Sequence, residues 1–228
     1  MSGFDRPSLT LALQKGIDAL TLPLNVTTVD KLIDYLALLS KWNAVYNLTA
    51  VRDPQQMVVQ HLLDSLTAWP SFDGAKRCLD VGAGGGLPGL VLAICAQQLQ
   101  PAMQIAMVDT VHKKTAFLTQ VKAELALANV TVHTTRVEQL QSEKPYDVIT
   151  SRAFANLADF VRWSSHLLAT NGRFIAMKGL IPRDEIAALP IGWKVSEILS
   201  LQVPGLTAER HLITIRRLVE AGTDTATA

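Results

Sequence analysis

Charge of one sign, cysteine and long apolar runs are all scarce in this chain of 228 residues. The formal net charge is +1, so the total charge points to neither nucleic acid nor a membrane surface, although a local basic face remains open. No apolar stretch is long enough to span a bilayer, and Asp5 and Arg6 interrupt the start. We therefore expect no membrane segment and no signal peptide, in a soluble protein of the cytoplasm.

Cysteine is limited to Cys78 and Cys95, which lie in apolar runs and lack C-x-x-C spacing. We expect both thiols to be buried and reduced, and we expect no metal site. Hydrophobic residues make up 49% of the chain and charged residues only 18%, so a large core can form and disorder is not expected. The length allows one large domain with an appendage.

The rest of the chain is organised around one glycine-rich stretch. It reads Cys78-Leu79-Asp80-Val81-Gly82-Ala83-Gly84-Gly85-Gly86-Leu87-Pro88-Gly89 and holds five of the 13 glycines. The apolar run before the glycines predicts a strand, and the apolar run after them predicts a helix. Glycine permits positive φ and lets a ligand approach bare backbone, while a helix start offers free N–H groups and a positive dipole end. The pattern therefore predicts a cofactor-binding turn on an open α/β sheet.

Two cofactor classes fit this turn. Residues 84–89 match the dinucleotide fingerprint G-x-G-x-x-G, which is a weak signal alone. The longer pattern, a hydrophobic residue followed by Asp-Val-Gly-x-Gly-x-Gly, resembles motif I of class I S-adenosylmethionine (SAM) methyltransferases. A purely structural turn is the third interpretation. Asp109 follows the apolar run 105–108 and can accept both hydroxyls of a cofactor ribose in either class, or it can cap the next helix.

From Lys76 the chain alternates strands and helices, which implies parallel β-α-β units with right-handed crossovers. Two β-rich runs at the end, separated by Pro204-Gly205, predict an antiparallel pair, with Arg216 and Arg217 on a solvent-exposed edge. The predicted strands are Arg77–Val81, Gln104–Val108, Val130–Thr134, Asp147–Ser151, Arg173–Met177, Val195–Val203 and His211–Leu218. The predicted helices of this part are Leu87–Leu99, Val111–Ala128, Leu157–Leu168 and Arg183–Leu189.

Before the sheet, the chain is predicted to be helical. Thr27-Thr28-Val29-Asp30 fits a capping box, and the helix behind it should end near Trp42. Pro54 starts a further helix, which ends at Trp69-Pro70 because the residue before a proline avoids the helical region. We therefore divide the chain into a helical extension over residues 1–74, a cofactor-binding domain over 75–221 and a frayed tail over 222–228.

Four strand ends carry candidate site residues, because ligands of open parallel sheets lie beyond the carboxyl ends of the strands. The glycine loop and Asp109 supply two of them. After the third strand, the backbone N–H of Val137 or Glu138 can pair with an adenine edge, although Glu138 can equally be a solvated acid. After the fourth, we expect Arg152 to face the crevice, where an unpaired charge is costly. Its partner is then a carboxylate, an RNA phosphate or a base edge, unless it only forms a structural ion pair.

Six sequence blocks follow one another over nearly the whole chain. They are Lys41-Trp42-Asn43-x-x-Tyr46-Asn47-Leu48-Thr49-Ala50-Val51-Arg52-Asp53-Pro54, His61-x-x-Asp64-Ser65, Asp80-Val81-Gly82-x-Gly84-x-Gly86-Leu87-Pro88-Gly89, Ser151-Arg152-Ala153-Phe154-Ala155, Lys178-Gly179 and Glu209-Arg210-His211. Together they resemble the family of ribosomal small-subunit methyltransferase G, formerly glucose-inhibited division protein B. The resemblance implies the α/β class I SAM-methyltransferase fold, a Rossmann-like and mostly parallel seven-stranded sheet with a terminal antiparallel strand, preceded by an N-terminal helical segment. It also implies methyl transfer from SAM to N7 of one guanine in 16S rRNA, near the decoding centre.

The residue pattern and the resemblance together assign candidate roles. The catalytic candidates are Arg152 and Lys178. The cofactor-binding candidates are Gly82, Gly84, Gly86, Leu87, Asp109, Val137, Glu138 and Arg152. The RNA-binding candidates are Lys41, Arg52, His61, Arg210 and His211. The expected partner is 16S rRNA or the small ribosomal subunit, and we expect a monomer without membrane contact. Gly85 is a local departure, because relatives often carry proline or alanine there.

The chemistry of guanine N7 agrees with what the chain lacks. This nitrogen has an in-plane lone pair and no proton to lose, so catalysis can consist mostly of alignment and needs no general base. The Asn/Asp-Pro-Pro-Tyr/Phe motif of amine methyltransferases is absent, and no cysteine follows the later strands. From the residues alone three other functions stay open: an NAD oxidoreductase, a methyltransferase of small molecules, and a non-catalytic RNA-binding assembly factor.

Overall fold

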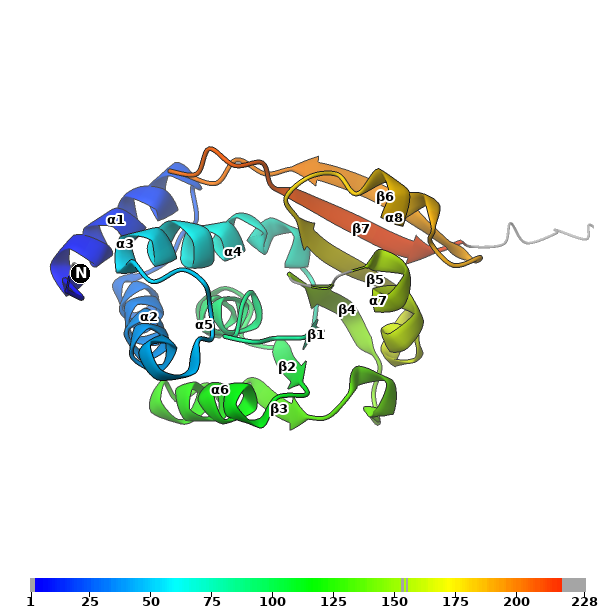
Figure 1. The fold of residues 1–228 in the computed structure, drawn as a ribbon, viewed down its shortest axis with the longest axis horizontal. Helices are drawn as coiled ribbons and strands as arrows, with labels where there is room; N and C mark the ends of the chain where they lie inside the picture. Colours follow the sequence, from blue (N-terminus) through cyan, green and yellow to red (C-terminus); the bar gives the residue numbers. More distant parts are fainter. Residues whose placement is uncertain (1–2, 153, 155, 219–228) are drawn as a thin grey trace, which may run out of the picture.

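The computed structural model describes residues 3–152, 154 and 156–218, and its centre is a seven-stranded sheet in the order β3-β2-β1-β4-β5-β7-β6 (Figure 1). The strands are β1 (Arg77–Val81), β2 (Gln104–Asp109), β3 (Val130–Thr134), β4 (Tyr146–Ser151), β5 (Leu168–Lys178), β6 (Trp193–Ser200) and β7 (His211–Arg217). Strands β1 to β5 pair in parallel, whereas β7 runs antiparallel to β5 and β6. The predicted sheet, mostly parallel with an antiparallel end, is confirmed. Its order reverses between β1 and β4, which is where an open sheet places its ligand crevice.

The position of β7 corrects one prediction. This strand lies between β5 and β6, so Arg216 and Arg217 are on an internal strand and the expected solvent-exposed edge was wrong. Residues 211–215 of β7 are all buried, while β6 exposes five of its eight residues and forms the edge instead. An apolar strand with two hydrogen-bonded neighbours and a polar strand at the edge is the arrangement that limits edge-to-edge aggregation.

Helices cover both faces of the sheet. On one face, α5 (Gly89–Leu99) and α6 (His112–Glu124) share a hydrophobic cluster with the N-terminal helices, and α5 is buried from Gly89 to Ala96. On the other face, α7 (Leu157–Ser164) packs into a second cluster, and α8 (Arg183–Ala187) contacts α7. Helix α5 is apolar all round because the sheet lies on one side of it and the N-terminal helices on the other.

The N-terminal segment is helical as predicted, with different boundaries. Its elements are α1 (Arg6–Ala19), α2 (Val26–Tyr46), α3 (Pro54–Met57), a π-helix (Val58–Leu63), α4 (Asp64–Thr67) and a 3-10 helix (Trp69–Phe72). Helix α2 starts earlier than the predicted capping box, because Asn25 Oδ1 accepts a hydrogen bond from Thr28 N at 2.9 Å. It also runs past Trp42 to Tyr46, where Asn47 takes the left-handed conformation that ends it.

The N-terminal helices are tied directly to the glycine loop. The hydroxyl of Tyr35, a fully buried residue in the middle of α2, donates to the carbonyl oxygen of Gly85 at 2.7 Å. Helix α2 also packs on α5 and α6, so the loop is held between the sheet and the N-terminal segment. In the described ranges no helix combines the length and the apolar character that a membrane crossing needs, and no group of three or more His, Cys, Asp or Glu is placed to hold a metal ion.

Candidate active site

The glycine loop after β1 takes a backbone conformation that residues with side chains rarely adopt. Gly82, Gly84 and Gly86 have φ of 69°, 54° and 88°. A Cβ on Gly86 would lie 2.3 Å from Leu90 Cδ1, so only glycine fits there. At Gly82 a Cβ would meet nothing within 4 Å, which leaves bare backbone beside an open space. The predicted strand, glycine turn and helix are therefore present, with α5 starting at Gly89 and not at Leu87.

A buried carboxylate lies beneath this loop. Asp80, at the end of β1, is fully buried and its Oδ2 accepts a hydrogen bond from Gly89 N at 2.9 Å. Burial raises the pKa of Asp80 to about 7, against the Gly89 N–H and Arg152, which lower it. Its other oxygen, Oδ1, has no hydrogen-bond partner in the described part of the chain. A buried acceptor of this kind calls for a donor, and an ammonium group bound at the loop would supply one.

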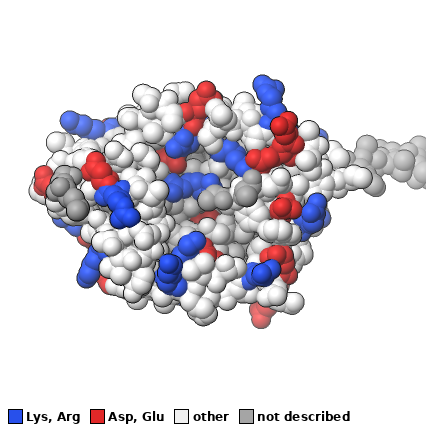
Figure 2. All heavy atoms as spheres, in the orientation of Figure 1, with Lys and Arg blue, Asp and Glu red and all other residues white. Residues whose placement is uncertain are grey.

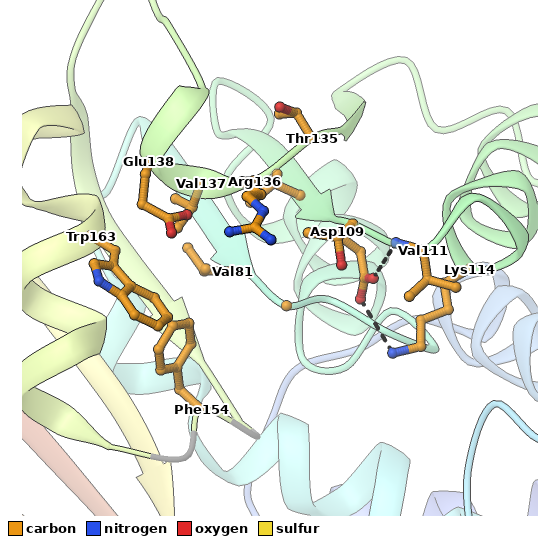
Figure 3. Close-up of a pocket in the computed structure, with 13 residues that line it drawn as sticks. Val81, Asp109, Val111, Lys114, Thr135, Arg136, Val137, Glu138, Phe154 and Trp163 are labelled. Atoms are coloured by element: carbon orange, nitrogen blue, oxygen red, sulfur yellow. Dashed lines mark hydrogen bonds and ion pairs between the residues drawn. The ribbon is translucent and has the colours of Figure 1, made fainter.

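A cavity of about 550 Å³ opens beyond the carboxyl ends of β1, β2 and β3 (Figure 3). We call it the cofactor pocket; it is lined by Val81, Gly82, Val108, Asp109, Thr110, Val111, Lys114, Thr135, Arg136, Val137, Glu138, Phe154 and Trp163. Its volume lies within the range of small-molecule sites. Mixed polar and aromatic walls next to a glycine loop are suited to a nucleoside-containing ligand.

Asp109 is the main polar group of the cofactor pocket. Its buried carboxylate accepts hydrogen bonds from Gly84 N at 3.0 Å and Val111 N at 2.9 Å, and Lys114 Nζ lies 3.6 Å away. It thus holds the glycine loop against the start of α6 while lining the cavity. A carboxylate has about four lone-pair sites, so acceptor capacity remains for ribose hydroxyls. Both interpretations of Asp109, helix start and ligand contact, are compatible with this geometry.

Two aromatic rings form the opposite wall. Phe154 and Trp163 meet edge to face with ring centroids 5.6 Å apart, and Figure 3 shows them across the cavity from Asp109. Trp163 lies on α7 and is 39% exposed, although it is a large apolar residue. The sequence patterns did not single out Trp163 or Lys114, because nothing in the order of residues shows which helix positions reach the cavity.

A second cavity, of about 430 Å³, lies on the other side of the end of β4. We call it the cationic pocket; it is lined by Thr49, Val51, Gln60, His61, Asp64, Arg152, Met177, Lys178, Gly179 and Arg210. His61, Arg152, Lys178 and Arg210 come from the π-helix, the end of β4, the end of β5 and the segment before β7. The structure therefore brings together four candidate residues that are far apart in the sequence.

Asp64 holds two of these cations in place. It is 2% exposed, and its carboxylate lies 3.0 Å from Arg210 Nε and 3.4 Å from Arg152 Nη1. Burial raises the pKa of Asp64, while Arg152 and Arg210 lower it. Arg152 Nη1 also donates to the carbonyl oxygen of Gln60 at 2.9 Å, in the π-helix. Short π-helical turns recur at functional sites, and here the turn presents a carbonyl to the arginine.

His61 and Lys178 complete the wall. His61 is 3% exposed, and its Nε2 lies 2.9 Å from Thr49 Oγ1. Burial and then Arg152 lower the pKa of His61 to about 4, so the ring is neutral near pH 7. Lys178 Nζ donates to Glu185 Oε2 at 2.9 Å and to the carbonyl oxygen of Phe154 at 3.1 Å. The cationic pocket thus carries more positive than negative groups, although the total charge of the chain is close to zero.

The two pockets meet at the end of β4. Arg152 lines the cationic pocket, and Phe154, two residues later, lines the cofactor pocket. Ala153 and Ala155, which complete the predicted block, lie outside the described residues. Several Lys and Arg side chains lie around the hollow near the middle of the face in Figure 2. A group held in one pocket can therefore face a group held in the other.

A family model described as GidB, rRNA small subunit methyltransferase G, matches residues 28–213. The chain belongs to this family. A ribosomal RNA small subunit methyltransferase G from Janthinobacterium sp. (strain Marseille) is 64% identical over 219 residues, which cover 96% of this chain and 100% of the relative. The enzyme of that name from Herminiimonas arsenicoxydans is 65% identical over 217 residues, covering 95% and 100%. The family predicted from the sequence blocks is therefore confirmed.

Solved structures show the same fold at low identity. A putative O-methyltransferase from Klebsiella pneumoniae has a TM-score of 0.57 and 15% identity, covering 94% of this chain and 99% of its own. The N-methyltransferase NodS from Bradyrhizobium japonicum WM9, in complex with S-adenosyl-l-homocysteine, has a TM-score of 0.52 and 12% identity, covering 78% and 98%. These likenesses establish the class I methyltransferase fold for this GidB family member.

The predicted site residues of this GidB family member fall into three groups. Gly82, Asp109, Val137 and Glu138 line the cofactor pocket, whereas Gly84, Gly86 and Leu87, which follow Gly82 in the loop, are not among its lining residues. The cationic pocket holds four further candidates, Arg152, Lys178, His61 and Arg210. The ring nitrogen Nδ1 of His211 lies 2.6 Å from the carbonyl oxygen of Gly179. Lys41 and Arg52 are exposed on the surface. Arg152 therefore lines the cationic pocket and is absent from the lining of the cofactor pocket.

Proposed function

We propose that this protein transfers a methyl group from SAM to N7 of a specific guanine in 16S rRNA of the small ribosomal subunit. The observation that carries the proposal is the pair of pockets that meet at the end of β4, one suited to a nucleoside-containing cofactor and the other cationic. Membership of the rRNA small subunit methyltransferase G family supports the same reaction and substrate.

The residues of the cofactor pocket fit SAM. Asp109 offers acceptor capacity for the ribose hydroxyls, the loop from Gly82 offers bare backbone, and Asp80 Oδ1 is an unpartnered acceptor beneath that loop among the described residues. Val137 and Glu138 follow β3, where their backbone N–H groups can pair with the adenine edge. When bound, SAM supplies an electrophilic methyl group on a positively charged sulfur.

The cationic pocket is suited to hold and align the guanine nucleotide. Arg152 and Arg210 keep several N–H donors beyond those that Asp64 and the backbone occupy, and such donors bind phosphates and base edges. Guanine N7 carries no proton that must be removed before it attacks the methyl group. His61, although its ring is neutral near pH 7, is therefore not needed as a general base. Alignment by fixed donors can then account for a large part of the rate enhancement, because holding the reacting groups in a productive orientation can lower the activation barrier by about 7 kcal/mol or more.

The setting of the reaction follows from the substrate. We propose that the protein acts as a monomer in the cytoplasm, on 16S rRNA or on the small subunit, and that membranes play no part. In this proposal, contact with the RNA or alignment of the base is the role of Lys178, Lys41, Arg52 and His211.

The test is to incubate the protein with labelled SAM and small ribosomal subunits from cells that lack this activity. Digestion of the 16S rRNA and mass spectrometry then locate the methylated nucleotide. We expect one N7-methylguanine in 16S rRNA and no transfer to a panel of small metabolites. Label only in metabolites would show a small-molecule methyltransferase, and binding of RNA without transfer would show a non-catalytic assembly factor.

A further inference from the structure

A third cavity, of about 420 Å³, lies far from the two pockets, between β5, β6, β7 and the segment after α4. It is lined by Ser71, Arg173, Ser196, Glu197, Thr214 and Arg216. Lys178, at the end of β5, belongs to the cationic pocket, and Arg173 precedes it by five residues, about 16 Å along the strand. One strand therefore connects the cationic pocket with this cavity.

Three cations form a row across the strands at this place. Phe174 pairs with Ile215, so the residues one step further, Arg173 on β5 and Arg216 on β7, lie opposite each other. On the other side of β7, Arg216 pairs with Lys194 on β6. Residues directly opposite on antiparallel strands point to the same face, and like charges in such pairs are destabilising. Burial, and next the charge of Arg216, lower the pKa of Arg173.

No carboxylate of the described residues forms an ion pair with this row, although the charges of Asp147 and Asp73 act to raise the pKa of Arg173. In the ranges that the structure describes, neither arginine nor Lys194 lies within ion-pair distance of an acidic group, and Glu197 on the cavity wall is no exception. Arg173 donates to the carbonyl of Ser71 at 2.8 Å, and Arg216 to that of Asn171 at 3.2 Å. A guanidinium has five N–H donors, so most donors of both side chains remain free for a ligand.

We propose that Arg173, Arg216 and Lys194 form a second RNA-binding site, which holds backbone phosphates of the substrate away from the cationic pocket. Arginine binds phosphate oxygens in a bidentate manner, and the hydroxyls of Ser71 and Thr214 are further phosphate donors on the cavity wall, whereas the Ser196 hydroxyl donates to the carbonyl oxygen of Thr214. The row crosses three strands and spans about 10 Å, which exceeds a single phosphate and suits consecutive phosphates of a chain. The inference rests on the proposed RNA substrate.

The test compares Arg216→Gln with Arg217→Gln. Arg217 is the next residue, carries the same charge and points to the opposite face, where it stacks on Trp193 at 4.8 Å. Binding of small subunits or a 16S rRNA fragment is measured over a range of salt concentrations. We expect Arg216→Gln to weaken binding about tenfold and to reduce the slope of log K against log salt by about 0.7 for each lost phosphate contact. Turnover at saturating RNA and the Kd of SAM should match those of the Arg217→Gln protein.

Further variants keep the outcome decisive. Lys194 is exposed, so Lys194→Gln tests the row even if Arg216→Gln folds poorly. Equal salt slopes for Arg216→Gln, Lys194→Gln and Arg217→Gln would overturn the inference while leaving rRNA methylation intact. A wild-type protein that methylates no rRNA would instead refute the proposed function. Stabilisation of wild type but not of Arg216→Gln by inorganic phosphate, with unchanged RNA slopes, would show a site for free phosphate and overturn the RNA contact.

Discussion

The cofactor pocket and the cationic pocket lie side by side but are built by opposite means. The first is lined mainly by runs of consecutive residues at the ends of three neighbouring strands, β1, β2 and β3, with the glycine loop joined to Asp109 by the hydrogen bond from Gly84 N. The second is made of side chains from four distant segments, which are held together by Asp64. A ligand with a fixed shape can be bound by backbone, whereas a large RNA substrate calls for long charged side chains.

The two pockets also differ in the charged groups that surround them. Asp80 beneath the glycine loop has a carboxyl oxygen without a partner among the described residues, and a cationic group bound there would supply a donor. In the cationic pocket, the buried carboxylate of Asp64 forms ion pairs with two arginines, Arg152 and Arg210. His61 is neutral near pH 7 because its pKa is lowered. The first pocket therefore favours the positively charged donor, and the second favours the anionic nucleic acid.

The largest expected effect comes from Arg152→Ala, because Arg152 lines only the cationic pocket. We expect kcat/KM for rRNA methylation to fall about 1,000-fold, ~4 kcal/mol, since a half-buried charged hydrogen-bond donor is lost. The Kd of SAM should change less than threefold. The free energy of unfolding, followed by thermal melting, should fall by much less than the loss in activation free energy. Arg162→Ala, on the exposed side of α7, is the matched control. If SAM binding falls as much as turnover, the division between the two pockets is wrong.

The two pockets should also differ in the sign of their pH dependence. Asp80 has a folded pKa of about 7 against an ordinary value of 3.8, so its contribution to stability is full below pH 3.8 and is lost as the pH rises to 7. His61 has a folded pKa of about 4 against 6.5, so stability is present above pH 6.5 and is lost as the pH falls to 4. The two contributions, on the order of 4 kcal/mol for Asp80 and 3 kcal/mol for His61, oppose one another.

Single variants separate these contributions. In denaturant titrations between pH 4 and pH 7, Asp80→Asn should shift the slope of stability against pH in the positive direction relative to wild type, because the rise due to His61 is then opposed only by the fall due to Asp64. His61→Gln should leave stability that falls with pH, because Asp80 and Asp64, whose pKa values are both raised, then dominate. Identical pH profiles for both variants would contradict the assigned environments of Asp80 and His61.

A smaller effect is expected from Asp109→Asn, which alters only the cofactor pocket. Loss of the charged acceptor should weaken SAM binding about tenfold to thirtyfold, ~2 kcal/mol. The KM for RNA and turnover at saturating SAM should stay close to wild type. Asp159→Asn, an exposed acid on α7, is the control for the change of charge. Equal weakening of RNA binding in the Asp109→Asn protein would show that the pockets are coupled.

The smallest effect should come from Tyr35→Phe, which removes the link between α2 and the glycine loop. The lost hydrogen bond to Gly85 O should lower the free energy of unfolding by about 1 kcal/mol and weaken SAM binding a few-fold. Calorimetric titration with SAM and thermal melting measure both. Tyr46→Phe, an exposed residue of the same helix, should change neither. An unchanged Kd for Tyr35→Phe would mean that the N-terminal helices do not position the loop.

The sequence predicted most of what depends on local pattern and little of what depends on distant contacts. The strand ends, the glycine turn and Asp109 follow from apolar runs and glycines, and they lie in or next to one cavity. The role of Asp64 in holding Arg152 and Arg210 could not be predicted, because it joins residues 88 and 146 positions apart. The π-helix around His61 has no sequence signature either. The predicted start of β5 at Arg173 was wrong, because the strand begins at Leu168 and continues through Asn171 and Gly172.

The central claim is that backbone and carboxylate at the ends of β1 and β2 hold SAM next to the cationic pocket. A crystal structure with S-adenosylhomocysteine tests it most directly. We predict the ribose hydroxyls on Asp109, the amino-acid part along the glycine loop and the sulfur facing the end of β4. Density for the ligand anywhere else, with this cavity left to solvent, would contradict the account.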